Sequence, residues 1–344
     1  IDNAFGGCNQ NGSAEGKITV IIDDAGERDC PLNVDYVYGG SNLARYRPDD
    51  PTITSPIVEL RNGTVYKDVF GGGHGSADNV NAGLVTSNPL VVMGGGKRID
   101  SVALIRQHIV KWIDIDPVND AGDKFWVKGN IYGGGEMGSV GNFTRVDNAV
   151  TAGAANTSKT TVDIRTGTVG PDAMPAEFLS GYTGDNFQRD RIVGMVFGGS
   201  KGAVGDTTVK PFYSHIAYAN QTEVIIGNSD HTGPFIKGSV YGGAQSGRVY
   251  TGGTYVKIQG GQIGCGADES DPYSAGQFIA TPATVDNTNH LAECPHWDFG
   301  RDDGNGVEHL PFDLFATNST ADARPKGSDG HTFYGNVFGG GSGY

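Results

Sequence analysis

The chain has 344 residues, with 56 glycines and a formal net charge of −14 at pH 7. This acidic balance excludes nucleic acid and insertion into anionic membranes, because these partners require clusters of Lys and Arg. Collagen is excluded because glycine follows no G-X-Y period and proline numbers only 15. A hydrophobic content of 37 % excludes intrinsic disorder, and the chain contains no run of 18 apolar residues to cross a membrane.

A short motif opens the chain and recurs to its end: Val or Ile, then an aromatic residue, then two glycines. It begins as "NAFGG", with Ala before the aromatic, and closes as "NVFGGG". Such self-similarity predicts a structural repeat. The aromatic position is filled by Phe5, Tyr38, Phe70, Tyr132, Phe197, Tyr241 and Phe338. The branched position before it is filled by Val37, Val69, Ile131, Val196, Val240 and Val337.

Between copies of the motif lie segments in which apolar and polar residues alternate. Alternation with a period of two predicts half-buried β-strands. The dipeptides Asn62-Gly63 and Gly260-Gly261 predict turns after two of these strands. The segments are "KITVII" (17–22), "PIVELRNGTV" (56–65), "TVDIRTGTV" (161–169), "TEVIIG" (222–227) and "TYVKIQGGQIG" (254–264).

The repeat unit is therefore a motif strand, a small-residue turn, an alternating strand and a glycine turn. A unit this short cannot bury its own core, so consecutive units are expected to stack. The sequence predicts a single all-β domain over residues 1–344, a parallel β-helix (β-solenoid) of about six to seven coils. Loop insertions are expected where the motifs lie farthest apart, at about 97–128, 170–194 and 265–334.

The position two residues before the aromatic is mostly polar. Alternate residues of a strand share a face. We therefore expect Val and Ile to point into the core and the aromatic rings to point outward, where the Tyr hydroxyl groups meet water. The alternative is an aromatic ladder inside the core. The residues two positions before the aromatic are Asn3, Tyr36, Asp68, Asn130, Met195, Ser239 and Asn336.

The repeats "GNIYGGGEMGSVG" and "GNVFGGGSGY" resemble the glycine-rich β-helix surface proteins of Bacteroidota-type bacteria, which are adhesin-like. The resemblance covers the strands of the whole chain but not the three insertions. It implies a repeat architecture and a role at the cell surface. It supplies no catalytic residue.

Four cysteines allow three disulfide pairings. Neighbouring pairs are the simplest, so the prediction is Cys8–Cys30 and Cys265–Cys294, each closing a modest loop. Cys265 and Cys294, together with His290 and His296, could instead form a zinc site of nitrogen and sulfur ligands. An extracellular location favours the disulfides.

Two short acidic clusters are candidate sites for Ca²⁺, because they bring hard oxygen donors together. Neither has the spacing of an EF-hand, and solvated acidic loops are the alternative interpretation. No other cofactor is expected. The first cluster is Asp114, Asp116, Asp120 and Asp123, and the second is Asp302, Asp303, Asn305 and Glu308.

The segment "GGSKG" (198–202) matches the G-x-S-x-G pattern of serine hydrolases. It is also one copy of the repeat turn, so Ser200 is not expected to be a nucleophile. The even repetition of glycine turns, without a converging catalytic set, favours a non-enzymatic protein.

The alternative function is a carbohydrate-active enzyme, a polysaccharide lyase or glycoside hydrolase, on a β-helix scaffold. Carboxylates such as Asp298 and Glu308 could serve as a catalytic pair. The aromatic residues Trp126, Trp297 and Tyr182 could then line a groove for the sugar.

The expected location is extracellular or at the cell surface. A low content of Lys favours it. Sequons of the type N-x-S/T point the same way. They occur at Asn11, Asn62, Asn142, Asn156, Asn220 and Asn318.

The expected function is that of a structural or adhesive extracellular repeat protein. Because the same motif stands near both ends, copies are expected to stack head to tail into a filament, or the chain to be part of a longer surface fibre. The expected partners are further copies of the chain and a glycan or host-surface ligand.

Overall fold

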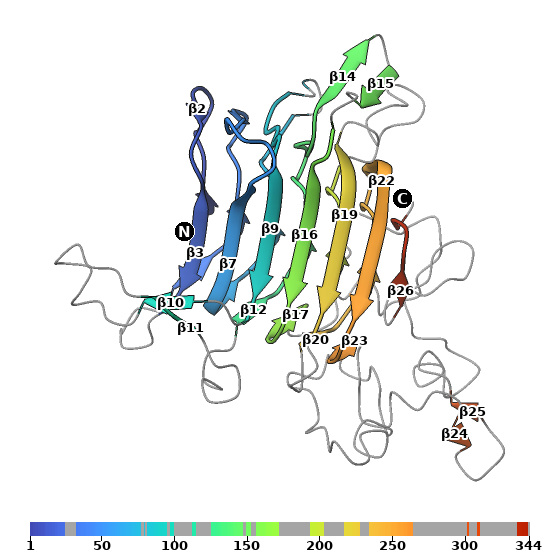
Figure 1. Cartoon of the computed structure of the whole chain (residues 1–344). Coiled ribbons are helices and arrows are strands. Elements are labelled where there is room, and N and C mark those ends of the chain that lie inside the picture. The colour runs from blue at the N-terminus through green and yellow to red at the C-terminus, as the bar shows by residue number, and fades with distance from the viewer. Residues whose placement is uncertain are drawn as a thin grey trace.

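The computed structural model describes only part of the chain, and all regular secondary structure in that part is β-strand (Figure 1). The strands form two large parallel sheets and four two-stranded sheets. The described residues are 1–24, 32–76, 79, 81–94, 97–99, 112–114, 125–146, 149–152, 156–171, 193–202, 217–227, 234–263, 301–302, 308–309 and 336–342.

The smaller of the two large sheets is built from the repeated motif. Each strand pairs parallel with the next in the register of the motif, so that Tyr38 lies opposite Phe70 and Tyr132 lies opposite Phe197. Equivalent residues therefore form continuous columns across the sheet. In sheet order the seven strands are β1 (Asn3–Phe5), β5 (Tyr36–Tyr38), β8 (Val69–Phe70), β13 (Ile131–Tyr132), β18 (Val196–Phe197), β21 (Val240–Tyr241) and β26 (Val337–Phe338).

The glycines after the aromatic allow this close stacking. A Cβ added to Gly133 would lie 2.3 Å from the carbonyl oxygen of Gly198 on the next strand. Real Cβ atoms do not approach an oxygen that closely, so the neighbouring backbone requires a residue without a side chain at this position.

The larger sheet has 11 strands, and Figure 1 shows its long strands lying side by side and pointing the same way. One path through it runs β22 (Arg248–Ile258), β19 (Tyr218–Ile226), β16 (Lys159–Ile164), β9 (Asn88–Met93), β7 (Thr54–Val65), β12 (Phe125–Val127), β17 (Thr168–Val169), β20 (Phe235–Ile236) and β23 (Gln262–Ile263). Two further strands, β3 (Thr19–Asp23) and β4 (Asn33–Val34), pair with β7.

Four small sheets complete the described strands. One is the parallel pair β2 (Ser13–Ala14) and β6 (Arg45–Tyr46). The others are antiparallel: β10 (Lys97–Ile99) with β11 (Trp112–Asp114), β14 (Phe143–Val146) with β15 (Ala149–Ala152), and β24 (Arg301–Asp302) with β25 (Glu308–His309).

The main core contains residues of both large sheets. The motif contributes its branched residues, such as Val69 and Ile131, and the larger sheet contributes a column that includes Val58, Val91 and Val162. All five side chains are fully buried. The alternating pattern of the sequence therefore places its apolar residues in one shared core.

The predicted parallel β-helix is wrong. The described chain is all-β with parallel main sheets, but these are a seven-stranded sheet and an open, curled 11-stranded sheet rather than a helix of six to seven coils. The difference is clearest at Asn62-Gly63, which does not form the predicted turn. Gly63, with φ of +123°, lies inside β7, and this one strand pairs with β9 through Leu60 and with β12 through Val65. Because β7 continues through this point, the sheet bends without being divided.

The three predicted insertions fall largely outside the described residues. Within 97–128, β10 and β11 pair with each other, and β12 belongs to the larger sheet. Within 265–334, only β24 and β25 are described.

Candidate functional site

The aromatic residues of the motif form one continuous stack. Consecutive ring centroids lie between 4.6 and 5.1 Å apart, from Phe5 to Phe338. Phe70, Tyr132 and Phe197 have no exposed surface. The prediction that the rings point outward is therefore wrong, and the aromatic ladder is the arrangement found. The branched residues of the motif lie in the main core from Val37 to Val240, so both faces of the inner strands β5, β8, β13, β18 and β21 are buried.

A column of side chains two positions before the aromatics supports the register. From β8 to β26, the side chain on each strand accepts a hydrogen bond from the backbone N–H of the equivalent residue on the next strand. The N–H of Asn130 donates to Asp68 Oδ1 at 2.9 Å, and the N–H of Met195 donates to Asn130 Oδ1 at 2.8 Å. The same contact links Ser239 N to Met195 Sδ and Asn336 N to Ser239 Oγ. This position therefore needs an acceptor atom rather than one residue type.

A second polar column lies four positions after the aromatics, just beyond the glycines. Several of its members contact the equivalent residue on the next strand. Asn42 Nδ2 donates to Asn9 Oδ1 at 2.7 Å, and His74 Nδ1 lies 2.7 Å from Asn42 Oδ1. His74 Nε2 lies 3.6 Å from Glu136 Oε2. The members are Asn9, Asn42, His74, Glu136, Lys201, Gln245 and Ser342.

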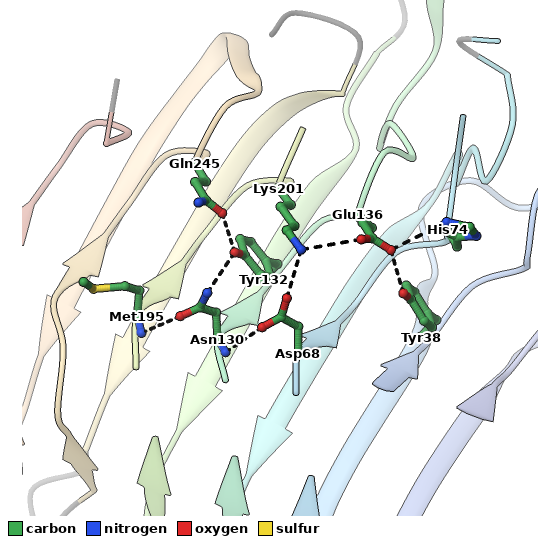
Figure 2. Close-up of polar contacts among 9 residues, drawn as sticks. All are labelled: Tyr38, Asp68, His74, Asn130, Tyr132, Glu136, Met195, Lys201 and Gln245. Carbon is green, nitrogen blue, oxygen red and sulfur yellow. Dashed lines mark hydrogen bonds and ion pairs between the residues drawn. The ribbon is translucent and has the colours of Figure 1, made fainter. Parts of the chain in front are cut away.

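The two polar columns meet in a charged cluster beside the aromatic stack (Figure 2). Lys201 Nζ lies 3.1 Å from Asp68 Oδ2 and 3.5 Å from Glu136 Oε1. The hydroxyl of Tyr38 donates to Glu136 Oε2 at 2.6 Å. The side chains of Asp68, Glu136 and Lys201 are 11, 23 and 21 % exposed. One cation thus lies between two partly buried carboxylates.

Two tyrosines of the stack place their hydroxyl groups into these polar columns. Tyr38 reaches Glu136, and Tyr132 donates to Gln245 Oε1 while accepting from Asn130 Nδ2 at 3.2 Å. In the order of the sheet, each residue that accepts from a tyrosine hydroxyl, Glu136 or Gln245, lies two strands away. These partners allow Tyr38 and Tyr132 to be buried in the stack without leaving their hydroxyl groups unsatisfied.

The charged groups and burial shift three pKa values in this region. Burial by itself lowers the pKa of Lys201, but Asp68 and Glu136 outweigh it and raise that pKa to about 12. Burial, and next the charge of Glu136, raises the pKa of Tyr38 well above its usual value. Burial, and next Asp68, raises the pKa of Tyr132 in the same direction. All three groups are held in their protonated forms.

These shifts predict that the protein loses stability in alkali. A raised pKa in the folded state adds stability below the unfolded-state pKa, and this stability is lost as the pH rises toward the folded-state value. For Lys201 that window runs from 10.5 to about 12, and for Tyr38 it opens at 10.0. Each group then contributes a loss of up to about 1.4 kcal/mol per pH unit.

Urea unfolding measured from pH 9 to pH 12 tests this expectation. The variant Tyr38→Phe, which cannot ionise at this position, should lose stability less steeply with pH than the wild type. If stability falls equally steeply with pH in the two proteins, the raised pKa of Tyr38 is contradicted.

The polar groups of this region that could carry chemistry are engaged in contacts within the fold. Asp68 and Glu136 are occupied by Lys201 and Tyr38, which leaves these two carboxylates engaged within the fold. Ser200 is fully buried, accepts from Gly135 N and donates to Gly138 O, both at 3.2 Å. Its hydroxyl therefore serves the repeat turn.

The predicted cysteine and metal sites lie mostly outside the described residues. Cys8 is partly buried, and Cys30, Cys265 and Cys294 lie outside the described residues, so both disulfides stay predictions. Neither acidic cluster has described side chains. Among the side chains that are described, no group of three or more His, Cys, Asp and Glu could hold a metal ion.

Two of the sequons are engaged inside the fold. Asn220 is 5 % exposed, and Asn62 Nδ2 donates to the carbonyl oxygen of Asp24 at 2.6 Å. Neither side chain is free for glycosylation in the folded protein. In the part of the chain that the structure describes, no helix has the length and apolar character needed to cross a membrane.

The sequence motif did not reveal the charged cluster. Its members occupy fixed offsets from the aromatics, yet the residue type changes from copy to copy. The polar column two positions before the aromatics is visible in the sequence, and aligning the chain with itself four positions after them would have identified the second column as well. Comparison with protein families, with curated proteins and with solved structures gives no match.

Proposed function

We propose that this chain is a structural, adhesive extracellular repeat protein whose copies add edge to edge into a filament. One observation carries the proposal: the same motif forms both outer strands of the seven-stranded sheet. In the described part of the chain, β1 pairs with β5 alone and β26 pairs with β21 alone. An outer strand presents backbone N–H and C=O groups that can pair with another strand.

The regular columns support the same function. Stacked rings repeat along the whole seven-stranded sheet, and side chain-to-backbone hydrogen bonds link its strands from β8 to β26, so one motif strand fits beside another. An interface in which one edge meets the other edge of a second copy does not close, and it produces a linear assembly. The adhesive role, with a glycan or host-surface ligand as partner, comes from the resemblance of the repeats to surface proteins.

Sedimentation velocity over a range of protein concentrations tests the proposal. We expect species much larger than the 36.0 kDa chain, whose share of the protein increases with concentration. Negatively stained electron micrographs should show filaments. Unchanged sedimentation at 36.0 kDa across that range, without filaments, would rule out the proposed function.

A further inference from the structure

From β1 to β21, the next strand in the sheet explains why a glycine directly follows the aromatic. A Cβ on Gly6 would lie 2.3 Å from the carbonyl oxygen of Gly39, and a Cβ on Gly242 would lie 2.5 Å from that of Gly339. The second glycine of the motif behaves similarly, since a Cβ on Gly243 would lie 2.5 Å from the backbone nitrogen of Gly341. Within the sheet, a glycine thus marks the close approach of a neighbouring backbone.

The two glycines of β26 are different. In the part of the chain that the structure describes, a Cβ on Gly339 or Gly340 would meet nothing within 4 Å. The neighbour that requires glycine everywhere else in this sheet is therefore missing from the described part of the chain at β26. The sequence of this strand suits a position inside the sheet, although the strand lies at its edge.

Side-chain exposure at β26 points to the same missing neighbour. Val337 is 46 % exposed and Phe338 is 38 % exposed, whereas their counterparts on β21, Val240 and Tyr241, are 0 and 4 % exposed. The ring of Phe338 stacks on Tyr241 at 5.1 Å, and no further ring of the described stack lies beyond it. A large apolar surface at the end of an ordered stack favours the addition of another ring.

We infer that β26 accepts β1 of a second copy as the next parallel strand, in the register of the internal pairs. This inference rests on the proposed function and names the strands that make the contact. The internal register places Phe5 of the second copy on Phe338, and Ala4 of the second copy opposite Val337. The strand β1 fits because it carries the motif, and its described pairing to β5 leaves its other edge available.

Addition to β26 is favoured over replacement of β26 by β1. Backbone hydrogen bonds already hold β26 to β21: Val240 N donates to Asn336 O at 2.9 Å and Gly242 N donates to Phe338 O at 2.8 Å. Ser342 Oγ also donates to the carbonyl oxygen of Gln245 at 2.9 Å. Replacement would break these bonds before making equivalent ones, whereas addition breaks none.

Addition also fixes the spacing between copies. The seven-stranded sheet sets the copies seven strands apart, whereas the row β3, β7, β9, β16, β19 and β22 of the larger sheet contains six. Among the described strands, a gap one strand wide is therefore left between β22 and β3 of the second copy. Its wall is the exposed edge of β22, where Tyr255 and Ile258 are 51 and 44 % exposed.

The variants Gly339→Ala and Gly340→Ala test the inference. Each adds a methyl group that meets no described residue of its own copy but would collide with the backbone of an added strand. We expect the urea midpoint of the dilute, unassociated protein to stay unchanged. The concentration for half-maximal association should rise roughly 10- to 100-fold, the cost of overpacking one interface.

Two control variants distinguish an effect on association from an effect on the stability of the single copy. Gly16→Ala also adds a methyl group to open space and should leave both folding and association unchanged. Gly242→Ala makes the same chemical change at an occupied position of the same column and should lower the urea midpoint of the single copy.

The outcomes distinguish the inference from the proposed function. If the wild type assembles and both alanine variants assemble equally well, the contact through β26 is wrong while the filament stands. If the wild type does not assemble at any concentration, the proposed function fails, and the inference that rests on it fails too.

Discussion

Replacing Lys201 with Met is expected to lower the free energy of unfolding by about 3–5 kcal/mol at pH 7. Lys201 lies between Asp68 and Glu136, at 3.1 and 3.5 Å, and all three side chains are mostly buried. Met keeps much of the volume but removes the charge. The carboxylates of Asp68 and Glu136 are then left close together without the Lys201 cation. Their repulsion and desolvation destabilise the folded state.

Urea unfolding of Lys201→Met and Lys159→Met measures this difference. Lys159 is the matched control, because its ion pair with Glu223, at 2.6 Å, has side chains that are 38 and 23 % exposed. Removing a more exposed pair should cost only about 0.2–1 kcal/mol. Equal losses for the two variants would show that the charged cluster has no special role in stability.

Replacing Phe197 with Ala is expected to cost a similar amount, about 3–5 kcal/mol. The ring is fully buried and stacks on Tyr132 and on Tyr241, with centroids 5.0 Å away on each side. Its removal opens a cavity inside the aromatic ladder and ends the stacking on both neighbours. The strands on either side are hydrogen-bonded in register, so they cannot close the cavity.

The control for this change is Phe338→Ala, at the exposed end of the same ladder. Phe338 stacks on one ring only and is 38 % exposed, so its loss should cost much less in the unassociated protein. Both variants are compared by urea unfolding at concentrations where the protein is a single copy. A loss at Phe338 equal to the loss at Phe197 would contradict the buried ladder.

Much of the local structure was predictable from the sequence, because strand formation depends on short patterns. The motif strands and alternating strands lie where the repeat places them, and the branched residues of every motif strand from β5 to β21 enter the core. The curvature of the larger sheet was not predictable from these patterns. Asn62-Gly63 is a common turn dipeptide, yet β7 continues through it because strands pair with both of its halves.

The prediction that the aromatic rings point outward failed for a different reason. Burying Tyr38 and Tyr132 requires partners for their hydroxyl groups, and Glu136 and Gln245 provide them from two strands away in the sheet. The distance along the chain is 98 residues in one case and 113 in the other. No local pattern encodes such a contact, and only the stacking of the strands creates it.

The rise per copy along the assembled filament, measured by electron microscopy, tests the central claim most directly. If β1 of one copy adds to β26 of the copy before it, seven strands separate equivalent points, which gives a rise of about 34 Å at ~4.8 Å per strand. A rise of about 29 Å, or six strands, would mean that β1 replaces β26 instead of adding to it. That result, or a filament in which adjacent copies run in opposite directions, would contradict the account.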